Sequence, residues 1–299
     1  MSKPANPPAG LTPASEFEVT PDFARALLAG QHPDLADRPI VLAENGWDNV
    51  MLRLGDHLAL RLPRRAVAAF LAVKEQRWLS VLGPALPLPT PIPVRTGVPA
   101  PGYPFPWSVV PWLEGTPADL APPGPDEGER LAAFLAALHQ PAPAEAPPNP
   151  YRGAPLAERA PAFEDRAAAI ERRTGAPLTS LREVWRAGLA EPIDAPSVWL
   201  HGDLHGRNVL VKDGRLAAVI DWGDLTAGDP ACDLAAVWML LPDAGARRRA
   251  MAAYPASPPS WVRARAWAAL MAVMLLAITD NRRMPAMGQA IADRLAAAP

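Results

Sequence analysis

The stretch His201-Gly202-Asp203-Leu204-His205-Gly206-Arg207-Asn208, followed by Asp221-Trp222-Gly223, is the most informative part of this sequence. The octet is polar, and the short apolar runs 198–200 and 209–211 on either side of it are typical of buried strands. The octet is therefore predicted to be a loop held between two strands. Because Asp213-Gly214 is a strong turn signal, the chain is expected to return as a hairpin whose second strand ends at Asp221.

This hairpin would bring Asp221 back beside the loop that carries Asp203 and Asn208. Two carboxylates and one amide around a single point are typical of a magnesium-dependent phosphoryl-transfer site. A hydroxyl that attacks a γ-phosphoryl group needs a carboxylate to orient it and to accept its proton, and Asp203 suits that role. Asn208 and Asp221 would supply hard oxygen ligands for Mg²⁺.

The spacing follows the protein-kinase pattern His-x-Asp-x-x-x-x-Asn and then Asp-x-Gly. Here the first motif contains Gly202, the second is Asp221-Trp222-Gly223, and Asp229-Pro230-Ala231-Cys232-Asp233-Leu234-Ala235 lies downstream. These three pieces, in this order, resemble the aminoglycoside phosphotransferase family, the small-molecule branch of the kinase fold. The resemblance implies an α+β, two-lobed protein-kinase-like fold, with a small antiparallel sheet in the N-lobe and a larger helical C-lobe. It also implies that Asp233 braces the loop by accepting backbone N–H bonds.

The two histidines of the loop, His201 and His205, could be metal ligands. For His201 a buried, hydrogen-bonded supporting role is favoured, and for His205 both interpretations stay open.

The residues predicted to bind the nucleotide lie in the N-terminal part of the sequence. Strands are expected at 41–43, 50–54 and 58–62, with a polar turn at 44–49 that contains Asn45. This is a β-meander of the kind that covers nucleotide phosphates in kinases, although it lacks a full G-x-G-x-x-G pattern.

Arg61 stands where the resemblance puts the Lys that touches the α- and β-phosphates. A guanidinium has the same charge but is not interchangeable with an ammonium. A helix is expected over 64–82, and its Glu75 is predicted to pair with Arg61; the alternative is a surface Glu beside Lys74. The run 60–65 also resembles macrolide phosphotransferases.

The Pro-rich segment 84–125 is predicted to be loop and edge strand, because proline cannot donate a backbone hydrogen bond. Within it, residues 107–115 resemble the family's strand and hinge, and the backbones of Trp112 and Leu113 are expected to contact adenine. Simple core packing is the alternative for Trp112. The predicted division is an N-terminal nucleotide-binding lobe at 1–110, a hinge at 111–116, and a helical C-lobe with the catalytic loop and substrate pocket at 117–299.

Helix signals surround these motifs. Residues 17–28 carry apolar residues at near-helical spacing, and Thr20-Pro21 is interpreted as the N-cap and the first residue of the helix. Arg247-Arg248-Arg249 is interpreted as a solvated helix face. Further helices are expected at 126–139, within 156–190, and at 234–241, 261–278 and 287–298.

The composition is that of an ordinary soluble protein, with 49% hydrophobic and 20% charged residues among 299. A net charge of -2 gives no electrostatic basis for binding nucleic acid. The apolar run 266–278 is too short to span a membrane. A single cysteine, Cys232, and an N-terminal stretch, 1–10, without the apolar core of a signal peptide both indicate a cytoplasmic protein.

These observations predict an Mg²⁺-dependent O-phosphotransferase that uses ATP or GTP and a small-molecule hydroxyl substrate, an antibiotic (aminoglycoside or macrolide) or a related metabolite. Residues 151–199 hold as many arginines as acidic residues, which is unfavourable for a polycation. One alternative is a nucleotide-binding pseudokinase that senses or scaffolds, since Arg61 replaces Lys. A weaker one is a metallophosphoesterase, because Asp203-Leu204-His205-Gly206 resembles its first metal motif. That site needs further histidines, and none follows His205.

Overall fold

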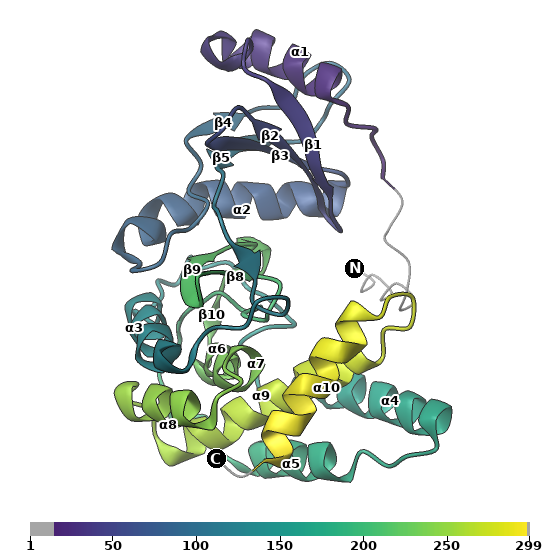
Figure 1. Cartoon of the computed structure of the whole chain (residues 1–299), viewed down its shortest axis with the longest axis vertical. Coiled ribbons are helices and arrows are strands. Elements are labelled where there is room, and N and C mark those ends of the chain that lie inside the picture. Colours follow the sequence, from purple (N-terminus) through teal and green to yellow (C-terminus); the bar gives the residue numbers. More distant parts are fainter. Residues whose placement is uncertain (1–14, 298–299) are drawn as a thin grey trace. The chain divides into compact units, whose positions relative to one another are not determined.

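The computed structural model describes residues 15–297, which form two compact units (Figure 1). The sheet unit comprises residues 15–115 together with Ala217–Leu225, and the helical unit comprises Thr116–Leu216 and 226–297. The N-terminal stretch 1–10 lies outside the described residues. The predicted lobes and the hinge at 111–116 stay predictions.

The sheet unit is built on a five-stranded antiparallel sheet with the order β1-β2-β3-β5-β4. The three strands predicted near the N-terminus are present and form the meander β1-β2-β3. The strands are β1 (Ile40–Asn45), β2 (Asn49–Leu54), β3 (Leu58–Pro63), β4 (Arg95–Gly97) and β5 (Trp107–Pro111).

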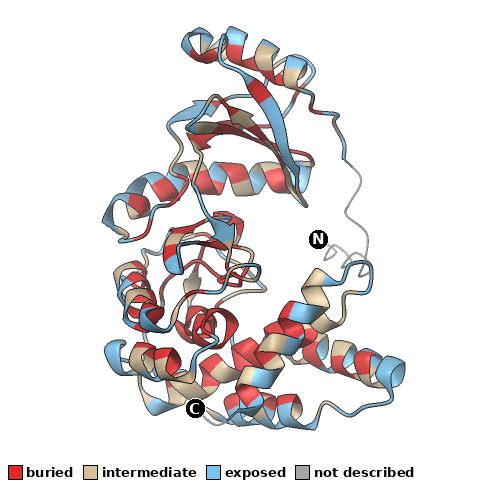
Figure 2. Ribbon diagram, in the orientation of Figure 1, coloured by how far each residue is buried: buried red, intermediate tan, exposed pale blue. Residues whose placement is uncertain are grey.

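Helices α1 (Pro21–Gln31) and α2 (Ala66–Leu82) lie on opposite sides of this sheet (Figure 1). The central strand β3 is consequently buried on both faces. Leu60 and Leu62 join the apolar core that includes α1, whereas Arg61, which points the other way because strand side chains alternate, reaches α2. Buried and exposed residues alternate along α2 (Figure 2).

The start of α1 is the predicted one. The side chain of Thr20 accepts a hydrogen bond from the backbone N–H of Phe23, 3.2 Å away, and Pro21 is the first helical residue. The helix runs past the predicted end to Gln31. Short 3-10 turns occur at η1 (Pro33–Leu35), η2 (Gly83–Ala85), η3 (Pro125–Glu127) and η4 (Trp222–Asp224).

The helical unit is organised around the long helix α9, which packs against α4, α5, α6, α7 and α10. Its central residues are buried on every side. No helix within residues 15–297 has both the length and the apolarity that a membrane span requires. The helices are α3 (Gly128–Leu138), α4 (Leu156–Thr174), α5 (Thr179–Ala190), α6 (Ala231–Leu234), α7 (Ala236–Leu240), α8 (Ala244–Ala253), α9 (Pro258–Leu276) and α10 (Arg283–Ala296).

Small strands hold the polar loop of the helical unit. Strand β7 (Val198–Leu200) pairs with β10 (Thr226–Gly228), and β8 (Val209–Lys212) lies between β6 (Thr116–Pro117) and β9 (Arg215–Val219). The octet 201–208 is therefore a loop between strands, as predicted.

Two local expectations were wrong, and one strand was missed. The helix predicted at 234–241 is two short helices, α6 and α7, which meet at Ala235. Strand β10 was not foreseen, because three residues carry no periodic signal. Arg247 is not on a solvated face: it is 3% exposed, and its Nη1 donates to the carbonyls of Leu241 and Pro242 at 3.0 and 2.8 Å.

Candidate active site

The polar loop of the helical unit is braced by Asp233 of α6, which is fully buried. Its Oδ2 accepts the backbone N–H of His201 at 2.6 Å, and its Oδ1 accepts that of Gly202 at 2.8 Å. Gly202 has a φ of 85°, a conformation that favours glycine. The bracing role implied for Asp233 is thus present in the structure.

A second layer supports Asp233. The Nε2 atom of His139 lies 3.5 Å from Oδ2 of Asp233, and its Nδ1 lies 2.7 Å from the hydroxyl of Tyr254. Burial, followed by the charges of Asp233 and Asp229, raises the pKa of Tyr254 to about 12. This hydroxyl is therefore neutral and able to donate at ordinary pH.

Asp203 is held by several donors at once. Its Oδ1 accepts a hydrogen bond from Nη2 of Arg152 at 2.7 Å, and its Oδ2 accepts one from Nδ2 of Asn208 at 3.0 Å. Nε2 of His205 lies 3.3 Å from the same Oδ2. Burial opposes ionisation, but the charges of His205 and Arg152 outweigh it and hold the pKa of Asp203 below its usual range. The carboxylate is therefore ionised and rigidly oriented.

The two histidines of the loop accept hydrogen bonds from backbone N–H groups of the same loop. Nδ1 of His201 accepts the backbone N–H of Asp203 at 3.2 Å, and Nδ1 of His205 accepts that of Arg207 at 3.3 Å. Burial lowers the pKa of His205, but its contact with the Asp203 carboxylate outweighs burial and raises it. Within residues 15–297 no three His, Cys, Asp or Glu side chains cluster as a metal site would require.

Asn208 has a free oxygen for a cation. Its Nδ2 donates to both the backbone carbonyl and Oδ2 of Asp203, each at 3.0 Å, which fixes the amide with Oδ1 turned away from Asp203. Among the described residues, Oδ1 of Asn208 has no donor. An amide oxygen held next to an ionised carboxylate fits Mg²⁺, which prefers hard oxygen ligands.

In the sheet unit, Arg61 connects two carboxylates. Its Nη2 lies 2.7 Å from Oε1 of Glu75 and 3.3 Å from Oδ1 of Asp221. The predicted Arg61–Glu75 ion pair is therefore present. Burial lowers the pKa of Arg61, but the two carboxylates outweigh it and raise it. For Glu75 burial dominates over the Arg61 charge and raises the pKa to about 7.

Asp221 is presented to solvent in a strained conformation. Its φ is 59°, in the left-handed region that non-glycine residues rarely adopt, and its side chain is 58% exposed. Only Oδ1 is engaged by Arg61, so the carboxylate has room for a further ligand. By its contacts Asp221 belongs to the sheet unit, and its approach to Asp203 and Asn208 stays a prediction.

The remaining predicted nucleotide contacts also lie in the sheet unit. Asn45 ends β1 opposite Val50 of β2. The backbone N–H of Trp112 donates to the carbonyl of His57 at 2.8 Å, so an adenine contact of Trp112 would have to use its carbonyl. The centroid of the Trp112 ring lies 4.8 Å from Cζ of Arg53. The roles of Asn45, Trp112 and Leu113 stay predictions.

Comparison with known families decides what kind of protein this is. The model described as the phosphotransferase enzyme family (APH) matches residues 39–267, a range that includes Arg61, Asp203 and Asp221. The chain belongs to the phosphotransferase enzyme family. None of the curated proteins compared with it matches.

Solved structures confirm the kinase-like fold of this phosphotransferase. The GDP complex of wild-type aminoglycoside 2'-phosphotransferase-IIIa is 17% identical, with a TM-score of 0.65, and the match covers 93% of this chain and 99% of the other. The apoenzyme of macrolide 2'-phosphotransferase MphH from Brachybacterium faecium is 25% identical, with a TM-score of 0.58 and coverages of 92% and 97%. The predicted enzyme class, a small-molecule kinase, is confirmed by the family match and these relatives.

Sequence reasoning missed two residues of this phosphotransferase's site. Arg152 lies outside every motif, after a Pro-rich connector, and no pattern marks it as the partner of Asp203. His139 ends a predicted helix and gives no sign of its contact with Asp233, since the two are distant in the sequence.

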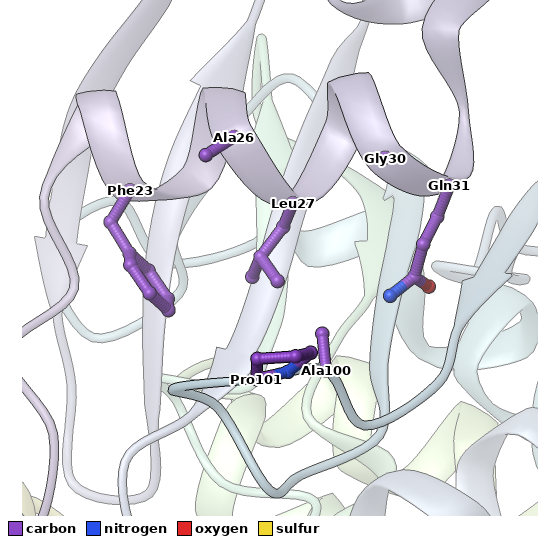
Figure 3. A pocket seen from close by; sticks show the side chains of 7 residues that line it. All are labelled: Phe23, Ala26, Leu27, Gly30, Gln31, Ala100 and Pro101. Atoms are coloured by element: carbon purple, nitrogen blue, oxygen red, sulfur yellow. The ribbon is translucent and has the colours of Figure 1, made fainter.

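A separate pocket of about 350 Å³ lies in the sheet unit of the phosphotransferase (Figure 3). Phe23 and Leu27 of α1 point toward Ala100 and Pro101 across it (Figure 3). It contains none of the predicted site residues and only one polar side chain, that of Gln31. This pocket therefore has no part in the predicted phosphoryl-transfer chemistry.

Proposed function

We propose that this phosphotransferase transfers the γ-phosphate of ATP or GTP to a hydroxyl group of a small molecule. The observation that carries this proposal is the fixed, ionised carboxylate of Asp203, which is bound by Asn208 in the family's loop. An ionised carboxylate can accept a hydrogen bond from the attacking hydroxyl and then its proton.

Three residues of the loop and its support have separate roles in the proposed reaction. Asp203 orients the hydroxyl toward the γ-phosphorus and takes its proton as the new P–O bond forms and the bond from the γ-phosphorus to the bridging oxygen breaks, which releases ADP or GDP. Asn208 holds the Asp203 side chain in place through its Nδ2 and keeps Oδ1 for a cation. Asp233 keeps the loop backbone in the required conformation.

Residues of the sheet unit would bind the nucleotide. Arg61 would bind the phosphates, and Glu75 fixes its direction. Asp221 and Asn208 would hold Mg²⁺, which when bound neutralises charge on the phosphates. Solved relatives in complex with GDP, or with streptomycin and ATP, support the use of a nucleotide.

The acceptor is an aminoglycoside, a macrolide or a related metabolite bearing a hydroxyl. Relatives of both antibiotic types support this range. A cytoplasmic location stays a prediction of the sequence.

The test is phosphoryl transfer from γ-labelled ATP and GTP, with Mg²⁺, to a panel of aminoglycosides, macrolides and hydroxylated metabolites. We expect a labelled, alkali-stable phosphate ester and no label transfer when Mg²⁺ is chelated. Tight nucleotide binding without transfer to any acceptor would favour a pseudokinase. Release of inorganic phosphate from simple esters, without a nucleotide, would favour a phosphoesterase instead.

A further inference from the structure

Arginines gather beside the loop that carries Asp203. Arg152 precedes α4 and binds Asp203 at 2.7 Å. Arg159 and Arg166 lie seven residues apart on α4, which places them on the same side of the helix. Burial, followed by the positive charges of Arg152 and Arg166, lowers the pKa of Arg159, so both neighbouring guanidinium groups repel that of Arg159.

Arg159 is a buried cation without an anion. The residue is 8% exposed, its buried Nε has no hydrogen-bond partner, and among residues 15–297 it has no ion pair. Its guanidinium lies over the ring of Tyr151, whose centroid is 5.1 Å from Cζ. A cation–π contact offsets only part of the cost of burying a charge. The position of Arg159 is therefore not explained by the stability of the fold.

The acidic residues of the same helix do not neutralise this group. Glu158, Glu164 and Asp165 are exposed, and Glu164 and Glu171 are both paired with Arg182 of α5. Asp203 is already engaged by Arg152. An anion that fits between Arg159 and Arg152 would thus have to come from a ligand.

We propose that the acceptor of the phosphoryl group carries an anionic oxygen group, a carboxylate or a phosphate, which Arg159 and Arg152 bind. This proposal rests on the proposed function of the Asp203 loop, and among the acceptors proposed there it selects a hydroxylated metabolite with an anionic group, because aminoglycosides are polycations. Guanidinium groups bind such groups through paired N–H donors, which fixes direction as well as charge. The anion competes with Asp203 for Arg152, so binding of the acceptor releases Oδ1 of Asp203 for the attacking hydroxyl.

The test measures the melting temperature of the full-length protein in the presence of inorganic phosphate or malonate. Saturating Mg²⁺ and a non-hydrolysable ATP analogue are added first, so that the nucleotide site is filled. The variants are Arg159→Met and, as a matched control, Arg172→Met, which removes the same charge from an exposed position of the same helix. A larger effect of malonate indicates a carboxylate acceptor, and a larger effect of phosphate indicates a phosphorylated one.

We expect the anion to raise the melting temperature of the wild type and of Arg172→Met, and to have little effect on Arg159→Met. No anion effect on the wild type, or an equal effect on Arg159→Met, would overturn the proposal. Without any ligand, Arg159→Met should melt at or above the wild-type temperature, because it removes an uncompensated buried charge. A marked decrease would show that Arg159 supports the fold and would also overturn the proposal.

Failure of the proposed function gives a different result. In that case no acceptor, with or without an anionic group, is labelled in the transfer panel, whereas the anion still raises the melting temperature of the wild type and not that of Arg159→Met.

Discussion

The Nη2 atom of Arg61 lies 2.7 Å from Oε1 of Glu75, and both side chains are almost completely buried, at 10% and 7% exposure. The pair joins β3 to α2, and the same Nη2 atom also lies 3.3 Å from Oδ1 of Asp221. Because an unpaired charge in this place would be costly, the pair supports the sheet unit as well as the direction of Arg61.

Glu75→Ala should lower the free energy of unfolding by about 2 kcal/mol at pH 8, less than the full loss for a broken buried pair because Asp221 still contacts Arg61. Urea unfolding measures this. The control is Glu114→Ala, which breaks the exposed Arg53–Glu114 pair and should cost less than about 0.5 kcal/mol. Equal losses of unfolding free energy in the two variants would show that the buried pair stabilises the fold no more than the exposed pair does.

The stability of the protein should depend on pH through Glu75. Its pKa rises from 4.5 to about 7 in the folded state, so the folded state binds the proton more tightly. The resulting stabilisation is fully present below pH 4.5 and is lost as the pH rises to about 7.

Glu75→Gln removes this titration. Between pH 4.5 and 7 the unfolding free energy of the wild type should fall by about 3 kcal/mol relative to that of Glu75→Gln, and above pH 8 the difference should be constant. Parallel pH profiles of the two proteins would show that Glu75 has an ordinary pKa.

Asp233 should be essential for the stability of the loop. Asp233→Ala leaves the buried N–H groups of His201 and Gly202 without acceptors, which should cost about 3 kcal/mol. Asp243→Ala removes one carboxylate acceptor at the start of α8 and should cost about 1 kcal/mol. If the two losses in unfolding free energy were equal, the hydrogen bonds of Asp233 would stabilise the protein no more than an ordinary helix cap does.

Asp221→Asn should weaken the binding of the Mg²⁺ complex of ATP by at least about tenfold, the loss that follows even when an outer partner of a metal ligand is removed. Calorimetric titration with and without Mg²⁺ measures this. Asp224→Asn makes the same charge change three residues away and should bind normally. Unchanged binding by Asp221→Asn would remove Asp221 from the metal site.

Much of the fold could be predicted because the signals were local. The cap at Thr20, the strand at 50–54 and the turn at Asp213-Gly214 each depend on neighbouring residues, and the structure contains the corresponding elements. Strand β10 was missed because three residues carry no periodicity. Its place depends on Gly228, where a Cβ atom would lie 2.4 Å from the carbonyl oxygen of Gly153.

The site was predictable where its residues fall in one motif. Asp203 and Asn208 are five residues apart, and their contact follows from the loop between β7 and β8. Arg152 lies 51 residues before Asp203, so only the packing of the helical unit brings them together. The burial of Arg159 likewise depends on tertiary structure, and a sequence count of charges cannot separate it from exposed arginines.

The most direct test of the central assignment is the turnover of Asp203→Asn, with Asp165→Asn as a control that removes one exposed charge from α4. With the acceptor found in the transfer panel, we expect kcat of Asp203→Asn to fall by about a hundredfold or more while the binding of the Mg²⁺ complex of ATP stays near normal. The control should turn over normally. Unchanged kcat in Asp203→Asn would contradict the assignment of Asp203 as the residue that orients and deprotonates the attacking hydroxyl.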